Sequence, residues 1–180
     1  MQTEKPVLIL MAGLPGSGKS TLAQAVGRRL GWPVIDKDTV KSGLLDLGAE
    51  EELAAQASYV LLHDFARDLV QGQGLSVILD TPSSYERVVK TCTEIAKDAN
   101  GALCIVLCEA TLETRAERLR TRERRASHVT GIDAEAEAEI AKRFEKLPKG
   151  TLRLSTEGPA DELVDEVVAH AVRVGIEEED

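Results

Sequence analysis

The sequence contains no apolar run long enough to span a bilayer, and residues 1–6 are too short, and too acidic at Glu4, for a signal peptide. Cysteine is scarce: three residues, an odd number without zinc-finger spacing. Cys104 and Cys108 lie in an apolar run, which is typical of small buried side chains. Free core thiols suit a reducing compartment, so we expect a cytoplasmic protein with no membrane partner.

Positive charge and aromatic rings are also in short supply. The 180 residues carry 22 Lys and Arg against 31 Asp and Glu, a formal net charge of −9, and aromatics make up 3%. Binding long nucleic acid requires a basic face, and single strands are held by stacking on aromatic rings. The composition therefore disfavours a nucleic-acid-binding protein, although it allows a local basic pocket. With 43% apolar and 29% charged residues, the chain reads as one globular domain over residues 1–180.

Short β-type runs alternate with amphipathic helical patterns along the chain. In one helical pattern, apolar residues recur every four positions, at Leu53, Ala57, Leu61, Phe65 and Leu69. The candidate strands are residues 7–11, 34–36, 76–80, 102–108 and 152–155. Apolar strands that alternate with helices indicate a parallel sheet covered on both faces. We therefore expect an α/β fold, a three-layer αβα sandwich with about five parallel strands, in which ligands bind at the carboxyl ends of the strands.

A complete Walker A motif, Gly-Leu-Pro-Gly-Ser-Gly-Lys-Ser, directly follows the first candidate strand. Leu22, Val26 and Leu30 recur at helical spacing after it, so the motif lies in a strand–loop–helix unit. The backbone N–H groups of such a loop surround phosphates at the positive end of the helix dipole. Lys19 would contact the β- and γ-phosphates, and the Ser20 hydroxyl would bind Mg²⁺. The predicted cofactors are ATP and Mg²⁺, and the predicted nucleotide-binding residues are Gly13, Leu14, Pro15, Gly16, Ser17, Gly18, Lys19, Ser20 and Thr21.

An acidic and basic segment follows the second candidate strand. Asp38 and Lys41 are three residues apart, so they share a face of a helix that begins here. Asp38 would accept the proton of a hydroxyl that receives a phosphoryl group, and Lys41 would hold the acceptor or the γ-phosphate. The alternative is that Asp36 or Asp38 only caps the helix.

Asp80 ends the third candidate strand, where it could order Mg²⁺ through water or hydrogen-bond the acceptor. A motor-type hydrolase would place a water-activating Glu directly after this Asp, but Thr81 stands there and favours transfer to another acceptor. The alternative is that Asp80 merely starts a turn with Thr81 and Pro82. No Asn/Thr-Lys-x-Asp element that reads guanine follows a strand, so we expect ATP rather than GTP.

Arginines gather after the fourth candidate strand. The arginines of this segment up to Arg120 are partly explained by ion pairing on a solvated helix, for example between Arg118 and nearby glutamates. Arg122 and Arg125 fall where this helix must break before Gly131, so they could close over the phosphates as a short lid of about residues 121–132. The predicted catalytic residues are Asp38, Lys19, Arg122 and Arg125.

Taken together, these segments resemble the small P-loop kinases grouped with zeta toxin, chloramphenicol phosphotransferase and polynucleotide 5′-kinase. Residues 13–21 are similar to their phosphate loop, and residues 35–41 resemble the segment in which an Asp is the general base. Residues 80–87 look like the polynucleotide-kinase stretch after the third strand, and residues 122–133 like the arginine-bearing lid. The resemblance implies a P-loop NTPase fold that uses ATP and Mg²⁺ on a hydroxyl acceptor. The candidate substrate-binding residues are Lys41, Asp80 and Arg87.

Three functions are compatible with these residues. We favour an ATP-dependent kinase that acts on a small-molecule hydroxyl. A polynucleotide 5′-hydroxyl kinase would use the same side chains, but the acidic composition and the few aromatics count against it. A regulatory P-loop ATPase without an acceptor is disfavoured by Thr81 after Asp80 and by the short chain. The pattern of residues names no particular acceptor.

Overall fold

The computed structural model describes residues 5–82, 85–121 and 133–176, and five strands of these residues form one sheet. The strand order is β2-β3-β1-β4-β5, and every neighbouring pair is parallel. The strands are β1 (Val7–Ala12), β2 (Val34–Asp36), β3 (Val77–Asp80), β4 (Ala102–Glu109) and β5 (Leu152–Ser155). The predicted parallel α/β sheet is therefore confirmed.

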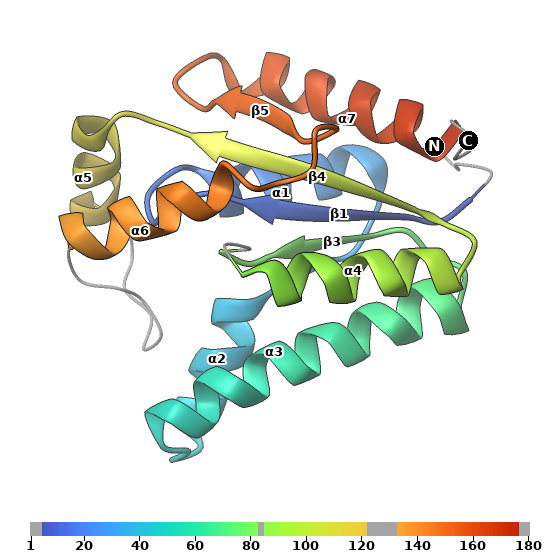
Figure 1. Cartoon of the computed structure of the whole chain (residues 1–180), viewed down its shortest axis with the longest axis horizontal. Helices are drawn as coiled ribbons and strands as arrows, with labels where there is room; N and C mark the ends of the chain where they lie inside the picture. Colours follow the sequence, from blue (N-terminus) through green and yellow to red (C-terminus); the bar gives the residue numbers. More distant parts are fainter. Residues whose placement is uncertain (1–4, 83–84, 122–132, 177–180) are drawn as a thin grey trace.

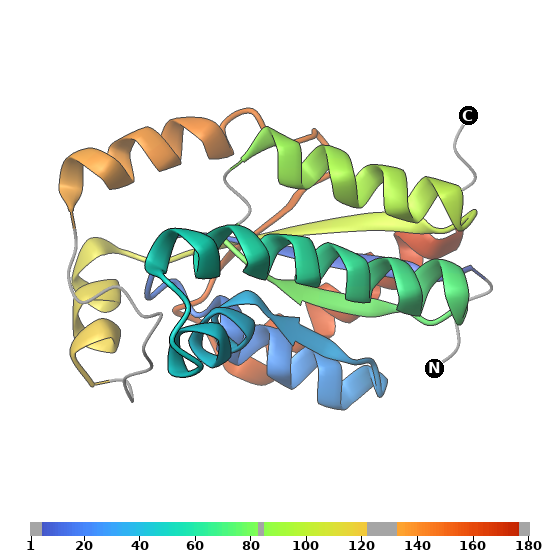
Figure 2. The same cartoon turned by 90° about the horizontal axis from the view of Figure 1, so that it is seen from below.

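Helices cover both faces of this sheet (Figure 1). Figure 2 shows α3 and α4 lying side by side along one face, while α1 and α7 lie beyond the strands. The helical elements are α1 (Lys19–Leu30), α2 (Lys37–Asp46), α3 (Glu51–Arg67), the π-helical turn η1 (Asp68–Gly72), α4 (Glu86–Asp98), α5 (Leu112–Thr121), α6 (Ala134–Phe144) and α7 (Ala160–Ile176). None of the described helices is long and apolar enough to cross a membrane.

Strand β1 lies at the centre of the sheet and of the core. Each of its residues is 0% exposed. Because side chains alternate along a strand, Ile9 and Met11 pack with α1 and α7, whereas Leu8 and Leu10 pack with α3 and α4. Strand β1 also separates the β2–β3 half of the sheet from the β4–β5 half. Its carboxyl end is thus the switch point at which ligands bind in open parallel sheets.

Helix α3 buries a different row of residues from the apolar row that the sequence displays. Its buried positions are Ala54, Ser58, Leu62 and Ala66. By contrast, Leu53 is 60% exposed and Phe65 50% exposed. Both rows repeat every four residues, so the period predicts the helix but not which row faces inward. Three of the four inward residues are small, which lets the helix approach its neighbours closely.

The three cysteines are buried and form no disulfide, as expected for Cys104 and Cys108 from their apolar run. Burial raises the pKa of Cys104 and of Cys92 to about 12, because the thiolate is poorly solvated in the core. These thiols are therefore packing residues rather than nucleophiles.

Candidate active site

The Walker A loop joins β1 to α1 and is shaped by glycines. Gly13, Gly16 and Gly18 all have positive φ angles, of 142°, 78° and 86°. A Cβ at Gly16 would lie 2.7 Å from the carbonyl oxygen of Arg115, and one at Gly13 would lie 2.5 Å from that of Cys108. Glycine is therefore required both by the backbone angles and by the close approach of α5 and β4.

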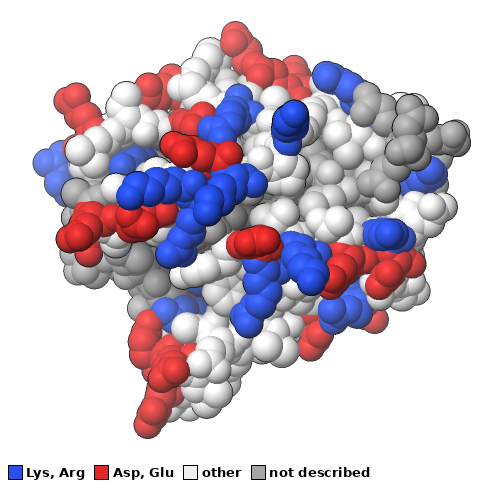
Figure 3. All heavy atoms as spheres, viewed as in Figure 1, with Lys and Arg blue, Asp and Glu red and all other residues white. Residues whose placement is uncertain are grey.

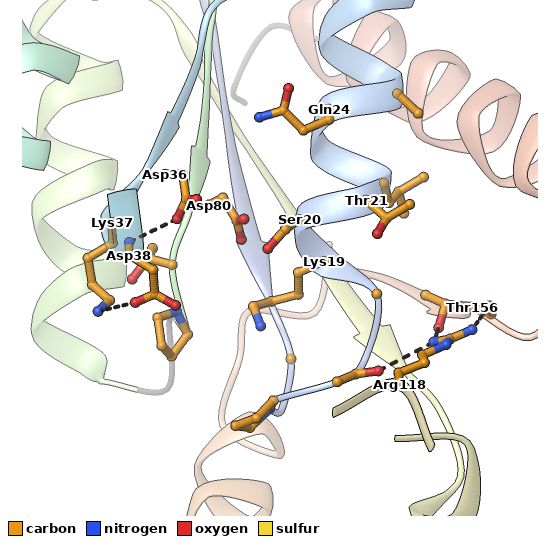
Figure 4. Close-up of a pocket in the computed structure, with 18 of the residues that line it drawn as sticks. Lys19, Ser20, Thr21, Gln24, Asp36, Lys37, Asp38, Asp80, Arg118 and Thr156 are labelled. Atoms are coloured by element: carbon orange, nitrogen blue, oxygen red, sulfur yellow. Dashed lines mark hydrogen bonds and ion pairs between the residues drawn. The ribbon is translucent and has the colours of Figure 1, made fainter. Parts of the chain in front are cut away.

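Lys19, Ser20 and Asp80 converge at the start of α1 (Figure 4). The Lys19 Nζ lies 3.5 Å from the carbonyl oxygen of Leu14, within its own loop. In Figure 4, the Ser20 hydroxyl points toward the carboxyl group of Asp80, which ends β3 and is 4% exposed. Burial raises the pKa of Asp80, while the charge of Lys19 and the nearby Ser20 side chain oppose that rise. The hydroxyl of Ser20 and the carboxyl group of Asp80 are hard oxygen donors, so this corner fits Mg²⁺.

A cavity of about 1010 Å³ lies over the carboxyl ends of the strands. One side of the cavity is formed by Arg118, Thr156 and Gly158, and the opposite side by the beginning of α2 and residues 80–82. Lys19 lies between the two sides (Figure 4). One cavity therefore joins the phosphate loop to the acidic segment after β2.

Asp36 and Asp38 play different structural roles at the beginning of α2. The Asp36 carboxylate accepts hydrogen bonds from the Asp38 backbone N–H at 2.8 Å and from the Thr39 hydroxyl at 2.9 Å. Asp36 is therefore the N-cap of the helix. The Asp38 carboxylate instead lies 2.7 Å from the Lys37 ammonium group and lines the cavity. The capping alternative thus applies to Asp36, and the carboxylate of Asp38 is directed to other contacts.

Lys41 and Arg87 occupy different positions relative to the cavity. Lys41 lines it from α2 with a side chain that is 13% exposed, and its ammonium group contacts the Glu51 carboxylate at the start of α3. Arg87 is exposed on the first turn of α4 and lies outside the cavity lining. Burial raises the pKa of Tyr59, and the charge of Arg87 partly opposes that rise. The structure therefore brings Lys41 into the cavity and leaves Arg87 outside its lining.

Arg118 has a role that the sequence pattern did not reveal. Its guanidinium group donates hydrogen bonds to the hydroxyl of Thr156 at 2.9 Å and to the carbonyl oxygen of Thr156 at 2.8 Å. The Thr156 hydroxyl in turn donates to the carbonyl oxygen of Ser17 at 2.7 Å. The interpretation of Arg118 as an ion-paired surface residue is therefore wrong: the side chain clamps the β5–α7 loop to the phosphate loop. Its position after β4, opposite the polar turn after β5, was the available signal.

The β5–α7 loop is also fixed at the other end of α5. The Glu157 carboxylate accepts hydrogen bonds from the Thr111 hydroxyl at 2.7 Å and the Thr114 hydroxyl at 2.6 Å. These hydrogen bonds favour the carboxylate form and lower the pKa of Glu157. Helix α5 therefore holds the loop at two points.

A buried ion pair connects α5, α6 and the phosphate loop. The Arg115 guanidinium group donates to both carboxylate oxygens of Glu137, each at 2.8 Å, and also to the carbonyl oxygen of Pro15 at 3.3 Å. The two side chains are 6% and 12% exposed. Arg115 is thus a second arginine of α5 that supports the phosphate loop. Arg122, Arg125 and the expected lid lie outside the described residues, apart from Thr121 at the end of α5.

The fold and this site together define the class of the protein. Residues 8–147 match the family described as AAA domain, so the chain belongs to this family of P-loop kinases. The predicted membership of the small P-loop kinases is thereby confirmed.

Similar proteins include one sequence relative that is named as a kinase. An uncharacterized protein of Mycobacterium tuberculosis is 32% identical over 168 residues, which cover 87% of this chain but only 33% of that protein. The adenylyl-sulfate kinase of Paraburkholderia xenovorans is 31% identical over 97% of this chain and 98% of its own length. The crystal structure of a putative kinase from Chloroflexus aurantiacus superimposes with a TM-score of 0.71 at 23% identity, over 97% of this chain and 99% of that chain.

Proposed function

We propose that the protein is an ATP- and Mg²⁺-dependent kinase that transfers the γ-phosphoryl group to a hydroxyl of a small molecule. The main support for this proposal is that the phosphate loop, Asp38 and Lys41 line the same cavity. A phosphoryl donor on the loop and an acceptor beside α2 would then be neighbours, as in-line transfer requires.

The phosphate loop and the turn after β5 would bind the nucleotide. The N–H groups of residues 13–20 would surround the β- and γ-phosphates, and Lys19 would neutralise part of their charge. Mg²⁺ would lie at Ser20 and Asp80, where it would neutralise the phosphate oxygens. Arg118 and the loop at Thr156 line the other end of the cavity, which we assign to the nucleoside part of ATP.

Asp38 would act as the general base for the acceptor hydroxyl. As the hydroxyl oxygen bonds to the γ-phosphorus, the bond from this phosphorus to the β,γ-bridging oxygen breaks, and ADP leaves. The hydroxyl proton passes to the Asp38 carboxylate. The adjacent Lys37 ammonium group holds this carboxylate in place. Arg122 and Arg125 would stabilise the charge that develops on the γ-phosphoryl oxygens, and Lys41 and Arg87 would bind the acceptor.

A transfer assay tests this function directly. The protein is incubated with γ-labelled ATP and Mg²⁺ in a protein-free extract of small molecules, in parallel with its Lys19→Ala variant. We expect label in a new compound only with the unmodified protein. A second reaction contains a short 5′-hydroxyl oligonucleotide in place of the extract. Label on this oligonucleotide, with none on any compound of the extract, would point to a polynucleotide kinase. Label released only as free phosphate would point to a regulatory ATPase.

Arg118→Gln should weaken ATP binding without changing the fold. The variant loses the charged clamp between α5 and Thr156, which is one of the two contacts that fix the β5–α7 loop in advance. A lost charged hydrogen bond of about 1.5–3 kcal/mol corresponds to a rise in the ATP dissociation constant of about 10- to 100-fold. Calorimetric titration with ATP measures this dissociation constant. Arg120→Gln is the matched control, because this side chain is 74% exposed and, among the described residues, its ion pair is with Glu117 on its own helix. Equal affinity of both variants for ATP would refute the role of this clamp in ATP binding.

A further inference from the structure

The two tyrosines of the chain meet behind the α2 side of the cavity. Tyr59 of α3 and Tyr85 at the start of α4 contact edge to face, with ring centroids 6.4 Å apart. The Lys37 ammonium group lies 5.5 Å from the Tyr59 ring centroid and 2.7 Å from the Asp38 carboxylate, and Lys37 itself lines the cavity. This tyrosine pair is therefore continuous with the cavity wall that holds the proposed general base.

Two arginines lie at this tyrosine pair from different elements. The Arg143 guanidinium group, from the end of α6, lies 5.2 Å from the Tyr85 ring centroid. Arg87, on the first turn of α4, acts electrostatically on the Tyr59 hydroxyl and lowers the pKa of His63, for which burial is the largest cause. On the face shown in Figure 3, Lys and Arg side chains gather over the end of α6 and the beginning of α4. Acidic side chains lie between these basic ones (Figure 3), so the region carries charges of both signs in a chain with a net charge of −9.

These arginines differ from the lysines of α2 in their ionic partners. Lys37 pairs with Asp38 and Lys41 with Glu51, so their charges are already matched. Arg87 and Arg143 form no salt bridge with any carboxylate that the structure describes. Both are exposed and therefore accessible to a ligand. Guanidinium groups bind carboxylate, sulfate and phosphate oxygens in a two-pronged geometry, and a neighbouring ring keeps the guanidinium plane oriented.

We propose that the acceptor is a small hydroxyl compound that carries a second, anionic group, and that Arg87 and Arg143 bind this group while the hydroxyl lies at Asp38. The inference rests on the proposed kinase function and narrows its substrate class to carboxylate, sulfate or phosphate compounds. Lys37 and the two tyrosines support the geometry, because the Lys37 ammonium group contacts both the Asp38 carboxylate and the Tyr59 ring, and Tyr59 contacts Tyr85. An acceptor that extends along these side chains from Asp38 can approach the arginines at Tyr85.

The first test separates the small-molecule extract by anion exchange. The retained compounds and the flow-through are each incubated with the protein, γ-labelled ATP and Mg²⁺. We expect the new labelled compound from the retained fraction, and mass analysis of the product identifies its anionic group. Product from the flow-through alone would overturn the anionic acceptor but leave the kinase intact. Product from neither fraction would overturn the kinase function and the inference with it.

The second test assigns the arginines, with the acceptor found in the retained fraction. Arg87→Gln and Arg143→Gln should each raise the KM for this acceptor about tenfold or more, while kcat and the KM for ATP stay within about twofold. Lys90→Gln is the matched control, since Lys90 is also exposed on α4. It should leave all three constants unchanged. An acceptor KM that is the same in Arg87→Gln, Arg143→Gln and Lys90→Gln would overturn the assignment.

Discussion

Replacing Asp38 by Asn should leave ATP binding intact and lower phosphoryl transfer by about 10²- to 10⁴-fold, the usual contribution of a general base. Asparagine has nearly the same shape, but its amide cannot accept the hydroxyl proton. Under the proposed function, ATP binds to the loop after β1 and the β5–α7 turn, which the substitution does not touch. Single-turnover transfer and calorimetric titration of ATP measure the two effects separately.

Asp46→Asn is the matched control for this experiment. It removes the same charge from the same helix, but Asp46 is exposed at the far end of α2. Transfer by this variant should equal that of the unmodified protein. Full transfer by Asp38→Asn would refute the general-base role. Thermal unfolding of each variant shows whether the loss of the Lys37 contact has changed stability instead.

Glu137→Ala should be the most destabilising of the substitutions considered. It leaves the Arg115 guanidinium group buried with only the Pro15 carbonyl oxygen as acceptor among its described contacts. Breaking a buried ion pair on one side costs about 3–5 kcal/mol of unfolding free energy. For a chain of this length, each kcal/mol lowers Tm by about 2–4 °C. Denaturant titration and thermal unfolding measure the loss.

The neighbouring pair on α6 provides the comparison. Glu139 and Lys142 are 59% and 66% exposed, so Glu139→Ala should change the unfolding free energy by at most about 1 kcal/mol. The double variant Arg115→Met with Glu137→Leu removes both charges and should recover most of the lost stability. Equal stability of Glu137→Ala and Glu139→Ala would contradict the burial argument.

The sheet and the phosphate loop were predictable from the sequence because they depend on local patterns. The apolar run at β1 must be buried, and the glycines of the Walker A motif permit the positive φ angles that the loop adopts. The alternation of strands and helices then requires a parallel sheet with its ligand edge at the carboxyl ends. The residues after β1, β2 and β3 therefore meet in one cavity, as expected.

The contacts that hold the site in place were less predictable, because they join segments that are far apart in the sequence. Arg118 and Thr156 meet across 38 positions of sequence, and Arg115 and Glu137 across 22. On α5, periodicity alone cannot distinguish an arginine that faces the phosphate loop from one that faces solvent. The capping role of Asp36 rather than Asp38 likewise depends on the residue at which α2 begins. The roles of Arg122 and Arg125 stay predictions, since they lie outside the described residues.

The place of α2 and α3 in the chain has an evolutionary consequence. Both helices lie between β2 and β3, at one edge of the sheet, whereas α5 and the turn after β5 surround the phosphate loop from the other half (Figure 1). Substitutions at the exposed and cavity-lining positions between β2 and β3 can therefore accumulate without disturbing the buried contacts of α5 that hold the Walker A loop. Under the proposed function, changes in this stretch could adapt related proteins to different acceptors, while the way in which they bind and use ATP stays the same.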